Sequence, residues 1–201
     1  MEVSLNIGKT ILSLCDYSGA WIKPYRDAGY NCIKIDLKLG QDVRLVKVSE
    51  LPKIHGILAA PPCTHFAIIG AVHWEKKGVG PLIEGLGIVD ACMRIILATE
   101  PEWWCLENPV GRLKYYLGDY AMSFQPCEYG DPYTKKTCLW GNFNTGLPKT
   151  IVEPKHAKIT SGRKSPGKLL TAHTLGTGEA RAAHRSLTPP GFAKAFFEAN
   201  R

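Results

Sequence analysis

The sequence of 201 residues lacks several features that would define a membrane or secreted protein. No apolar run approaches the roughly 20 residues needed to span a bilayer. The first residues contain no basic segment followed by an apolar stretch and a small-residue cleavage site. Neither an internal repeat nor a low-complexity tract is present. We therefore expect no membrane association and a cytoplasmic location.

The seven cysteines also lack the spacing of a metal site, because no two of them form a Cys-x-x-Cys pair. An odd number of thiols cannot be fully paired in disulfides, which favours a reducing compartment. Cys15, Cys32, Cys105 and Cys138 lie in apolar runs, where a buried thiol behaves as a small hydrophobe. We expect no metal.

The formal net charge is +7, and the excess is concentrated late in the chain. Residues 149–185 contain eight lysines and arginines but only two glutamates. A positive charge of this kind favours association with polyanions, and nucleic acid is the natural candidate. We expect segment 149–185 to contact phosphates, with an ordinary solvated basic surface as the alternative.

Apolar strands alternate with helical patterns over the first 110 residues, which indicates an α/β fold. Such a chain forms a mostly parallel sheet with helices on both faces and binds ligands beyond the carboxyl ends of its strands. The expected strands are 10–15, 31–36, 54–60 and 103–106, and the expected helices are 20–28, 86–99 and 110–116.

The remaining segments are less regular. Residues 64–83 contain three glycines and a proline, so we expect a mobile loop of about 20 residues, a length that usually serves function. Strands at 123–127 and 137–140 are expected to pair. Residues 144–180 are loop-rich, and 192–199 form a last helix.

Polar residues follow the first two expected strands. The turn Asp16-Tyr17-Ser18-Gly19 lets backbone approach a nucleoside-like ligand, although Ser18 could simply cap the next helix. Asp36 ends the second strand, where an acid accepts hydrogen bonds from ribose hydroxyls. Asp42 could face an adenine amino group or lie in solvent.

Two further motifs follow the third and fourth strands. Pro61-Pro62-Cys63 has a rigid Pro-Pro that fixes the direction of a nucleophilic thiol, unless Cys63 is buried and inert. Glu107-Asn108-Pro109 places a carboxyl group at the same edge, where burial could raise its pKa so that it donates a proton. A favourable acid at a helix amino terminus is the alternative for Glu107.

These motifs, in this order and with the basic segment Lys135-Lys136-Thr137, resemble the C5-cytosine DNA methyltransferase family over residues 10–142. The resemblance implies a Rossmann-like SAM-dependent methyltransferase fold with S-adenosylmethionine (SAM) as cofactor. It implies that Cys63 attacks carbon 6 of a flipped-out cytosine in DNA and that Glu107 contacts the base. Carbon 5 then takes the methyl group.

By resemblance, Asn108 and Lys136 complete the catalytic set, with Lys135 as the neighbour of Lys136. The cofactor residues implied are Cys15, Asp16, Ser18, Gly19, Asp36, Asp42 and Pro61. We expect residues 1–143 to form the SAM-binding catalytic domain. Residues 144–201 form a short basic, loop-rich segment and a carboxyl-terminal helix that packs on it.

Only about 60 residues follow Trp140, which is too short for the target-recognition domain usual in this family. The tail 185–200 resembles compact, phage-type members, which implies little or short sequence preference. Modification of RNA, transfer of another group from a SAM derivative, a non-catalytic SAM- or nucleic-acid-binding protein, and a redox-sensing scaffold remain alternatives. Target sequence, strand state and oligomeric state stay open.

Overall fold

Six strands form one sheet in the computed structural model, which describes residues 8–155 and 186–201. In chain order the strands are β1 (Thr10–Leu14), β2 (Asn31–Ile35), β3 (Gly56–Ala59), β4 (Trp103–Pro109), β5 (Met122–Phe124) and β6 (Thr137–Asn142). Their order across the sheet is β2-β1-β3-β4-β6-β5. The chain adds β2 on one side of β1 and β3 on the other, so the strand order switches between β1 and β3, which is where open α/β sheets bind ligands.

Strands β1 to β4 run parallel, and β6 runs antiparallel to both β4 and β5. The predicted mostly parallel sheet and the predicted pairing of the two late strands are therefore confirmed. Because Leu14, Ala59 and Leu106 occupy one row of the parallel strands, the residues that follow them emerge together at the carboxyl edge.

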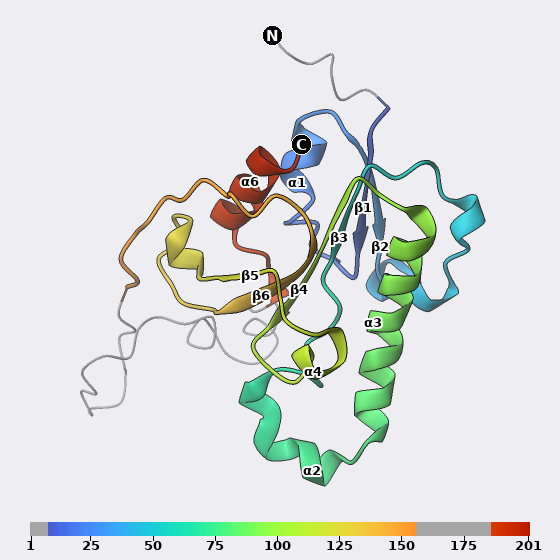
Figure 1. The fold of residues 1–201 in the computed structure, drawn as a ribbon, viewed down its shortest axis with the longest axis vertical. Helices are drawn as coiled ribbons and strands as arrows, with labels where there is room; N and C mark the ends of the chain where they lie inside the picture. Colours follow the sequence, from blue (N-terminus) through green and yellow to red (C-terminus); the bar gives the residue numbers. More distant parts are fainter. Residues whose placement is uncertain (1–7, 156–185) are drawn as a thin grey trace.

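One face of the sheet is covered by α3 (Gly80–Thr99), as Figure 1 shows. Cys92 and Ile95 of α3 are fully buried in the same cluster as Leu12 and Ile57 of the strands. Apolar residues three and four apart give the helix this inward stripe. The helix therefore packs along the central, parallel part of the sheet.

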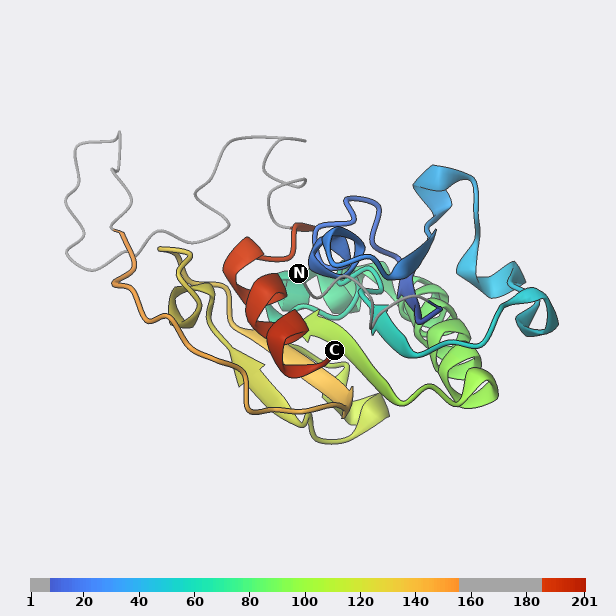
Figure 2. The ribbon, with the colours of Figure 1, turned by 90° about the horizontal axis from the view of Figure 1, so that it is seen from above.

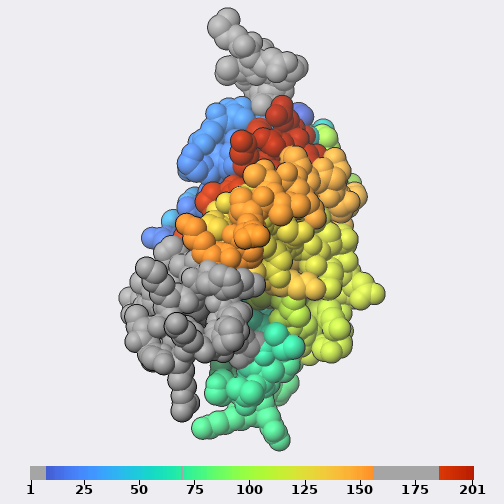
Figure 3. All heavy atoms as spheres, turned by 90° about the vertical axis from the view of Figure 1, so that its left-hand side faces the viewer, coloured from blue at the N-terminus to red at the C-terminus, as the bar shows by residue number. Residues whose placement is uncertain are grey.

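The other face carries α1 (Lys23–Asp27) and α6 (Pro190–Ala199), which lie side by side (Figures 1–3). The Tyr25 hydroxyl donates a hydrogen bond of 2.7 Å to the Asn200 carbonyl and so ties the end of α6 to α1. The Phe192 ring stacks on the Phe124 ring of β5, with 3.7 Å between the ring centroids. The aromatic residues buried in this cluster are Trp21, Tyr25, Tyr30, Trp103, Phe124, Tyr129, Phe192 and Phe196.

The prediction of a loop at 64–83 is wrong, because most of this segment is helical. A 3₁₀ helix (Ile68–His73) leads directly into α2 (Trp74–Lys77), and α3 already begins at Gly80. Gly78 interrupts the helical path with φ +68°, and Pro81 in the first turn of α3 restarts it. Gly78 and Pro81, which suggested a loop, therefore mark the end of one helix and the start of the next.

Two smaller differences concern the fourth strand. β4 extends to Pro109 because β6 pairs with its last residues, so Glu107 and Asn108 lie inside the strand rather than after it. The helix that follows, α4 (Lys114–Leu117), is a single turn. Single 3₁₀ turns also occur at Leu37–Leu39, Val43–Leu45, Val48–Glu50 and Pro126–Glu128. Among the described helices, none has the length and hydropathy needed to cross a membrane.

Candidate active site

The turn after β1 is organised by Asp16, which is buried. Its carboxylate accepts hydrogen bonds from the Gly19 amide at 2.9 Å, the Ser18 hydroxyl at 2.8 Å and the Ser13 hydroxyl at 3.2 Å. Cys15 and Gly19 both have positive φ, at 59° and 66°. The hydrogen bonds that both Asp16 oxygens accept thus hold the predicted cofactor turn in one conformation.

The two other predicted cofactor acids are placed differently. Asp36 follows β2, and its Oδ1 accepts the Lys38 amide hydrogen at 2.8 Å, which caps the next 3₁₀ turn. Asp42 lies farther along and forms a bidentate pair with the Arg44 guanidinium, at 2.9, 3.1 and 2.6 Å. Only Asp36 therefore lies at the strand edge with an oxygen not engaged by the described residues.

The turn that carries Cys63 is tied to β4. The Asn108 side-chain amide donates a hydrogen bond of 2.9 Å to the Pro61 carbonyl, and both residues are buried. The Cys63 carbonyl accepts from the amides of Phe66 and Ala67, each at 2.9 Å, which closes a turn directly after the thiol. Pro61, Cys63 and Asn108 are thus brought together as the sequence predicted.

Asn108 has one further property of a ligand site. Its side-chain oxygen is buried and accepts no hydrogen bond from the described residues. Buried polar atoms are nearly always paired in folded proteins, so an orphan at a strand's carboxyl end indicates a place where a ligand or water is bound.

Glu107 neighbours Asn108 but projects from the opposite face of the strand, because side chains alternate. Burial raises the pKa of the Glu107 carboxyl; the Lys135 ammonium opposes this rise, and the negative charge of Asp16 adds to it. A raised pKa keeps more of the carboxyl protonated at neutral pH. Glu107 can therefore serve as a proton donor beside the predicted cofactor turn.

The two lysines before β6 differ in their surroundings. Lys135 is half-buried, and its charge lowers the pKa of Glu107. Lys136 is exposed, and its charge lowers the pKa of the Cys138 thiol, which burial raises. The predicted catalytic role of Lys136 stays a prediction, but the lysine that acts electrostatically on Glu107 is Lys135.

Sequence reasoning missed Arg112, which lies three residues beyond β4. Its Nε donates a hydrogen bond of 2.7 Å to the His65 carbonyl, and its guanidinium carbon lies 4.3 Å from the ring centroid of Trp74. The only signal in the sequence was an arginine close after Glu107-Asn108-Pro109. Its partners lie about 40 positions earlier, so the pattern alone does not reveal them.

The predicted phosphate-binding segment 149–185 falls mostly outside the described residues. Of its lysines, Lys149 forms an ion pair of 2.7 Å with Glu128. In the ranges 8–155 and 186–201, no three His, Cys, Asp or Glu side chains are grouped so that they could hold a metal ion.

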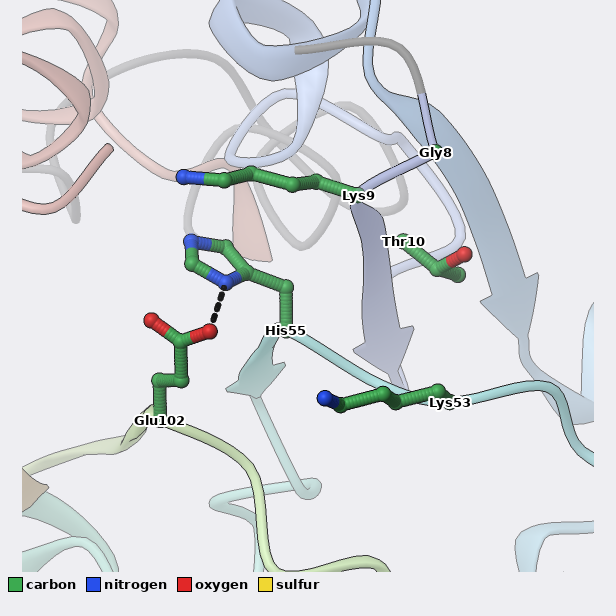
Figure 4. A pocket seen from close by; sticks show the side chains of 6 residues that line it. All are labelled: Gly8, Lys9, Thr10, Lys53, His55 and Glu102. Atoms are coloured by element: carbon green, nitrogen blue, oxygen red, sulfur yellow. Dashed lines mark ion pairs between the residues drawn. The ribbon is translucent and has the colours of Figure 1, made fainter. Parts of the chain in front are cut away.

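A separate pocket of about 140 Å³ lies at the opposite, amino-terminal edge of the sheet (Figure 4). His55 is buried there between the Glu102 carboxylate, at 3.0 Å from Nδ1, and the Arg201 carbonyl, at 3.1 Å from Nε2. The lining residues are Gly8, Lys9, Thr10, Lys53, His55 and Glu102. None of the predicted site residues lines it.

Comparison with solved structures agrees with a methyltransferase fold. The chain is similar to a crystal structure described as a DNA modification methyltransferase encoded within a prophage (E. coli), with a TM-score of 0.50 and 14% identity. The match covers 73% of this chain and 53% of that one, so this chain spans about half of its length. The Rossmann-like methyltransferase fold predicted from the sequence is confirmed.

Part of the sequence also matches a family model. Residues 23–119 match the model of the C-5 cytosine-specific DNA methylase family, a stretch that contains both Pro61-Pro62-Cys63 and Glu107-Asn108-Pro109. The resemblance to the C5-cytosine DNA methyltransferases is thereby confirmed. No curated protein matches the sequence.

Proposed function

We propose that this chain transfers a methyl group from SAM to carbon 5 of cytosine in DNA. The hydrogen bond from Asn108 to the Pro61 carbonyl carries the proposal, because it joins the turn bearing Cys63 to the strand bearing Glu107. A nucleophile and a proton donor are thus attached to adjacent strands at one sheet edge. The family match over both motifs supports the same chemistry.

Cys63 supplies the nucleophile. Carbon 5 of cytosine is a poor nucleophile while the ring is aromatic. Addition of the Cys63 thiolate to carbon 6 forms a sulfur–carbon bond and pushes the electron pair of the C5–C6 double bond toward carbon 5 and ring nitrogen 3. After transfer, a solvent water accepts the carbon 5 proton, and the electron pair left behind re-forms the C5–C6 double bond and expels the thiolate.

Glu107 supplies the proton. As the sulfur–carbon bond forms, negative charge would accumulate on ring nitrogen 3, and a protonated Glu107 neutralises it by donating there. The proton returns to Glu107 when the aromatic ring is restored. A pKa raised by burial suits this role, because the protonated acid must be present at working pH.

Members of this family use SAM, which supplies an electrophilic methyl group when bound. The residues present fit such a group: Asp36 ends β2 with an oxygen available to a ribose hydroxyl, beside the ordered Asp16–Gly19 turn. Asp42 would need to leave Arg44 to reach the cofactor. We further propose that residues 1–143 provide both the cofactor and the base sites.

DNA is the substrate that this chemistry and the net charge of +7 favour together. Carbon 6 of a stacked base is inaccessible to a thiol, so the cytosine must leave the helix. The half-buried Cys63 lies at the sheet edge, beside the 3₁₀ helix and α2 that project at the lower end of Figure 1. This edge is where an extruded base would enter.

The test is incubation with tritiated SAM and unmodified double- or single-stranded DNA, followed by digestion to nucleosides. Wild type should yield labelled 5-methylcytosine, and Cys63→Ala and Cys63→Ser should yield none. Cys127→Ala removes another half-buried thiol and should retain activity. Absence of labelled 5-methylcytosine from a wild-type protein that binds SAM would refute the proposal in favour of RNA, another transferred group or binding without turnover.

A further inference from the structure

Two segments that flank the candidate site lie against each other. The Ile68 amide donates to the Val110 carbonyl, and the Arg112 amide donates to the Phe66 carbonyl, both at 2.9 Å. Between them, Ala67 and Gly111 form an antiparallel bridge. The residues after Cys63 and the residues after Pro109 therefore form a short two-stranded contact beyond the main sheet.

Gly111 is required for this approach. A Cβ atom at that position would lie 1.9 Å from the Phe66 carbonyl oxygen and 3.0 Å from the Ala67 Cα. These neighbours are backbone atoms, and Phe66 is fully buried, so they cannot move aside without moving the turn. The close contact is therefore built into the sequence rather than an accident of loop packing.

Arg112 adds two side-chain attachments to the same segment. Its Nε holds the His65 carbonyl, two residues after Cys63, and its plane lies over the Trp74 ring at the start of α2. A guanidinium can do both at once because it is planar, lies face-on over the ring and donates from its edge, whereas a lysine ammonium is a compact point charge that cannot stack. One side chain thus contacts the chain on both sides of the 3₁₀ helix.

These attachments bear directly on the nucleophile. The turn after Cys63 is closed by its own carbonyl, so the position of the thiol depends on where Phe66 and Ala67 are held. They are held by the chain that continues from Glu107. A shift of about 1 Å between reacting groups can lower a rate by as much as 100-fold.

We propose that Arg112 is a positioning residue that sets the separation of Cys63 from Glu107 by clamping segment 65–74 onto the chain that leaves β4. The clamp follows from the contacts alone, and its effect on turnover rests on the proposed function. Because Arg112 would act through the turn after Cys63 and not by binding DNA, its loss should lower kcat and leave the KM for DNA little changed.

The first measurement needs no substrate: hydrogen exchange of peptides covering 64–77, with Arg112→Ala, Arg112→Lys, Trp74→Ala and Trp74→Phe. Arg112→Ala and Arg112→Lys lose both the stacked guanidinium and its Nε hydrogen bond and should speed exchange about tenfold or more. Trp74→Ala loses only the cation–π contact and should speed exchange about threefold. Trp74→Phe retains an aromatic face and should stay near wild type. Arg26→Ala removes an exposed arginine on α1 and controls for the loss of charge. Wild-type exchange in Arg112→Lys would overturn the clamp.

The second measurement is turnover. Arg112→Lys should lose about 10- to 100-fold in kcat, with KM for DNA changed by no more than about threefold. If Arg112 instead bound phosphate as a simple charge, lysine would restore kcat and alanine would raise KM, which would contradict the proposal. Should wild type lack methyltransferase activity, the proposed function fails while the exchange experiment still decides the clamp. Arg112→Lys and Trp74→Phe keep the test decisive even if Arg112→Ala does not fold.

Discussion

Glu102 and Glu107 stand near the two ends of β4, five positions apart, in opposite environments. Glu102 precedes the strand, is 68% exposed and lies 3.0 Å from the His55 ring. The Glu107 carboxylate accepts no hydrogen bond from the described residues, and burial raises its pKa. The amino edge thus pairs its acid, whereas the carboxyl edge leaves its acid unpaired.

The difference separates a stabilising use of a carboxylate from a chemical one. An exposed acid beside a histidine gains a modest attraction at little desolvation cost. A half-buried acid without a hydrogen-bond partner is unfavourable for folding, and its raised pKa makes it a candidate for chemistry. The same strand therefore contributes a structural pair at one end (Figure 4) and a reactive group at the other.

The largest expected effect comes from Glu107→Gln. The amide fills the same space but cannot transfer the proton, so methylation should fall about 100- to 10,000-fold. Glu102→Gln is the matched control, and activity per folded molecule should stay within about twofold of wild type. Both are measured as initial rates with tritiated SAM. Equal losses in the two variants would break the comparison between the two ends of β4.

The raised pKa of Glu107 should also make the free energy of unfolding depend on pH. Because the folded-state pKa of Glu107 is raised, its contribution is fully present below the unfolded pKa of about 4.3 and is lost as pH rises through the raised value. The free energy of unfolding of Glu107→Gln should therefore decline less with rising pH than that of wild type. Urea titrations across this range measure it, and parallel curves would contradict a raised pKa.

A smaller effect is expected at the amino edge. His55→Ala removes a buried ring that contacts both the Glu102 carboxylate and the Arg201 carbonyl at the end of the chain. The free energy of unfolding should fall by about 1–3 kcal/mol, while turnover of the folded protein is retained. Lys53→Ala, which alters an exposed wall of the same pocket, should change stability far less. If His55→Ala lost turnover without losing stability, the active site would lie at the amino edge of the sheet, contrary to the proposal.

Much of the fold could be predicted because its information is local. Runs such as Ile54–Ala60 are apolar and short, and an acid or a proline marks where each strand ends. The error at 64–83 has a local cause too. Gly78 and Pro81 are equally compatible with a loop and with the junction between two helices, and only the packing of α3 against the sheet decides.

Some residues of the candidate site could be predicted from the sequence, and others could not. Cys63 and Asn108 could be placed at one edge because parallel strands present their carboxyl ends together. Arg112 could not be assigned a partner, since His65 and Trp74 reach it only through the tertiary fold. Lys135 and Lys136 are adjacent in sequence, and the path of the chain into β6 determines which of them acts on Glu107.

That last choice gives the subtlest prediction. The Lys135 charge opposes the effect of burial on Glu107, so Lys135→Ala should raise the pKa of Glu107 further. If a protonated Glu107 is needed, the alkaline limb of the pH–rate profile should move to higher pH, with little change in turnover near the optimum. Lys136→Ala should leave the limb in place, because its charge acts on Cys138. Full pH–rate profiles of both variants decide between the lysines: movement of the limb in Lys136→Ala alone would assign the electrostatic role to Lys136 instead of Lys135.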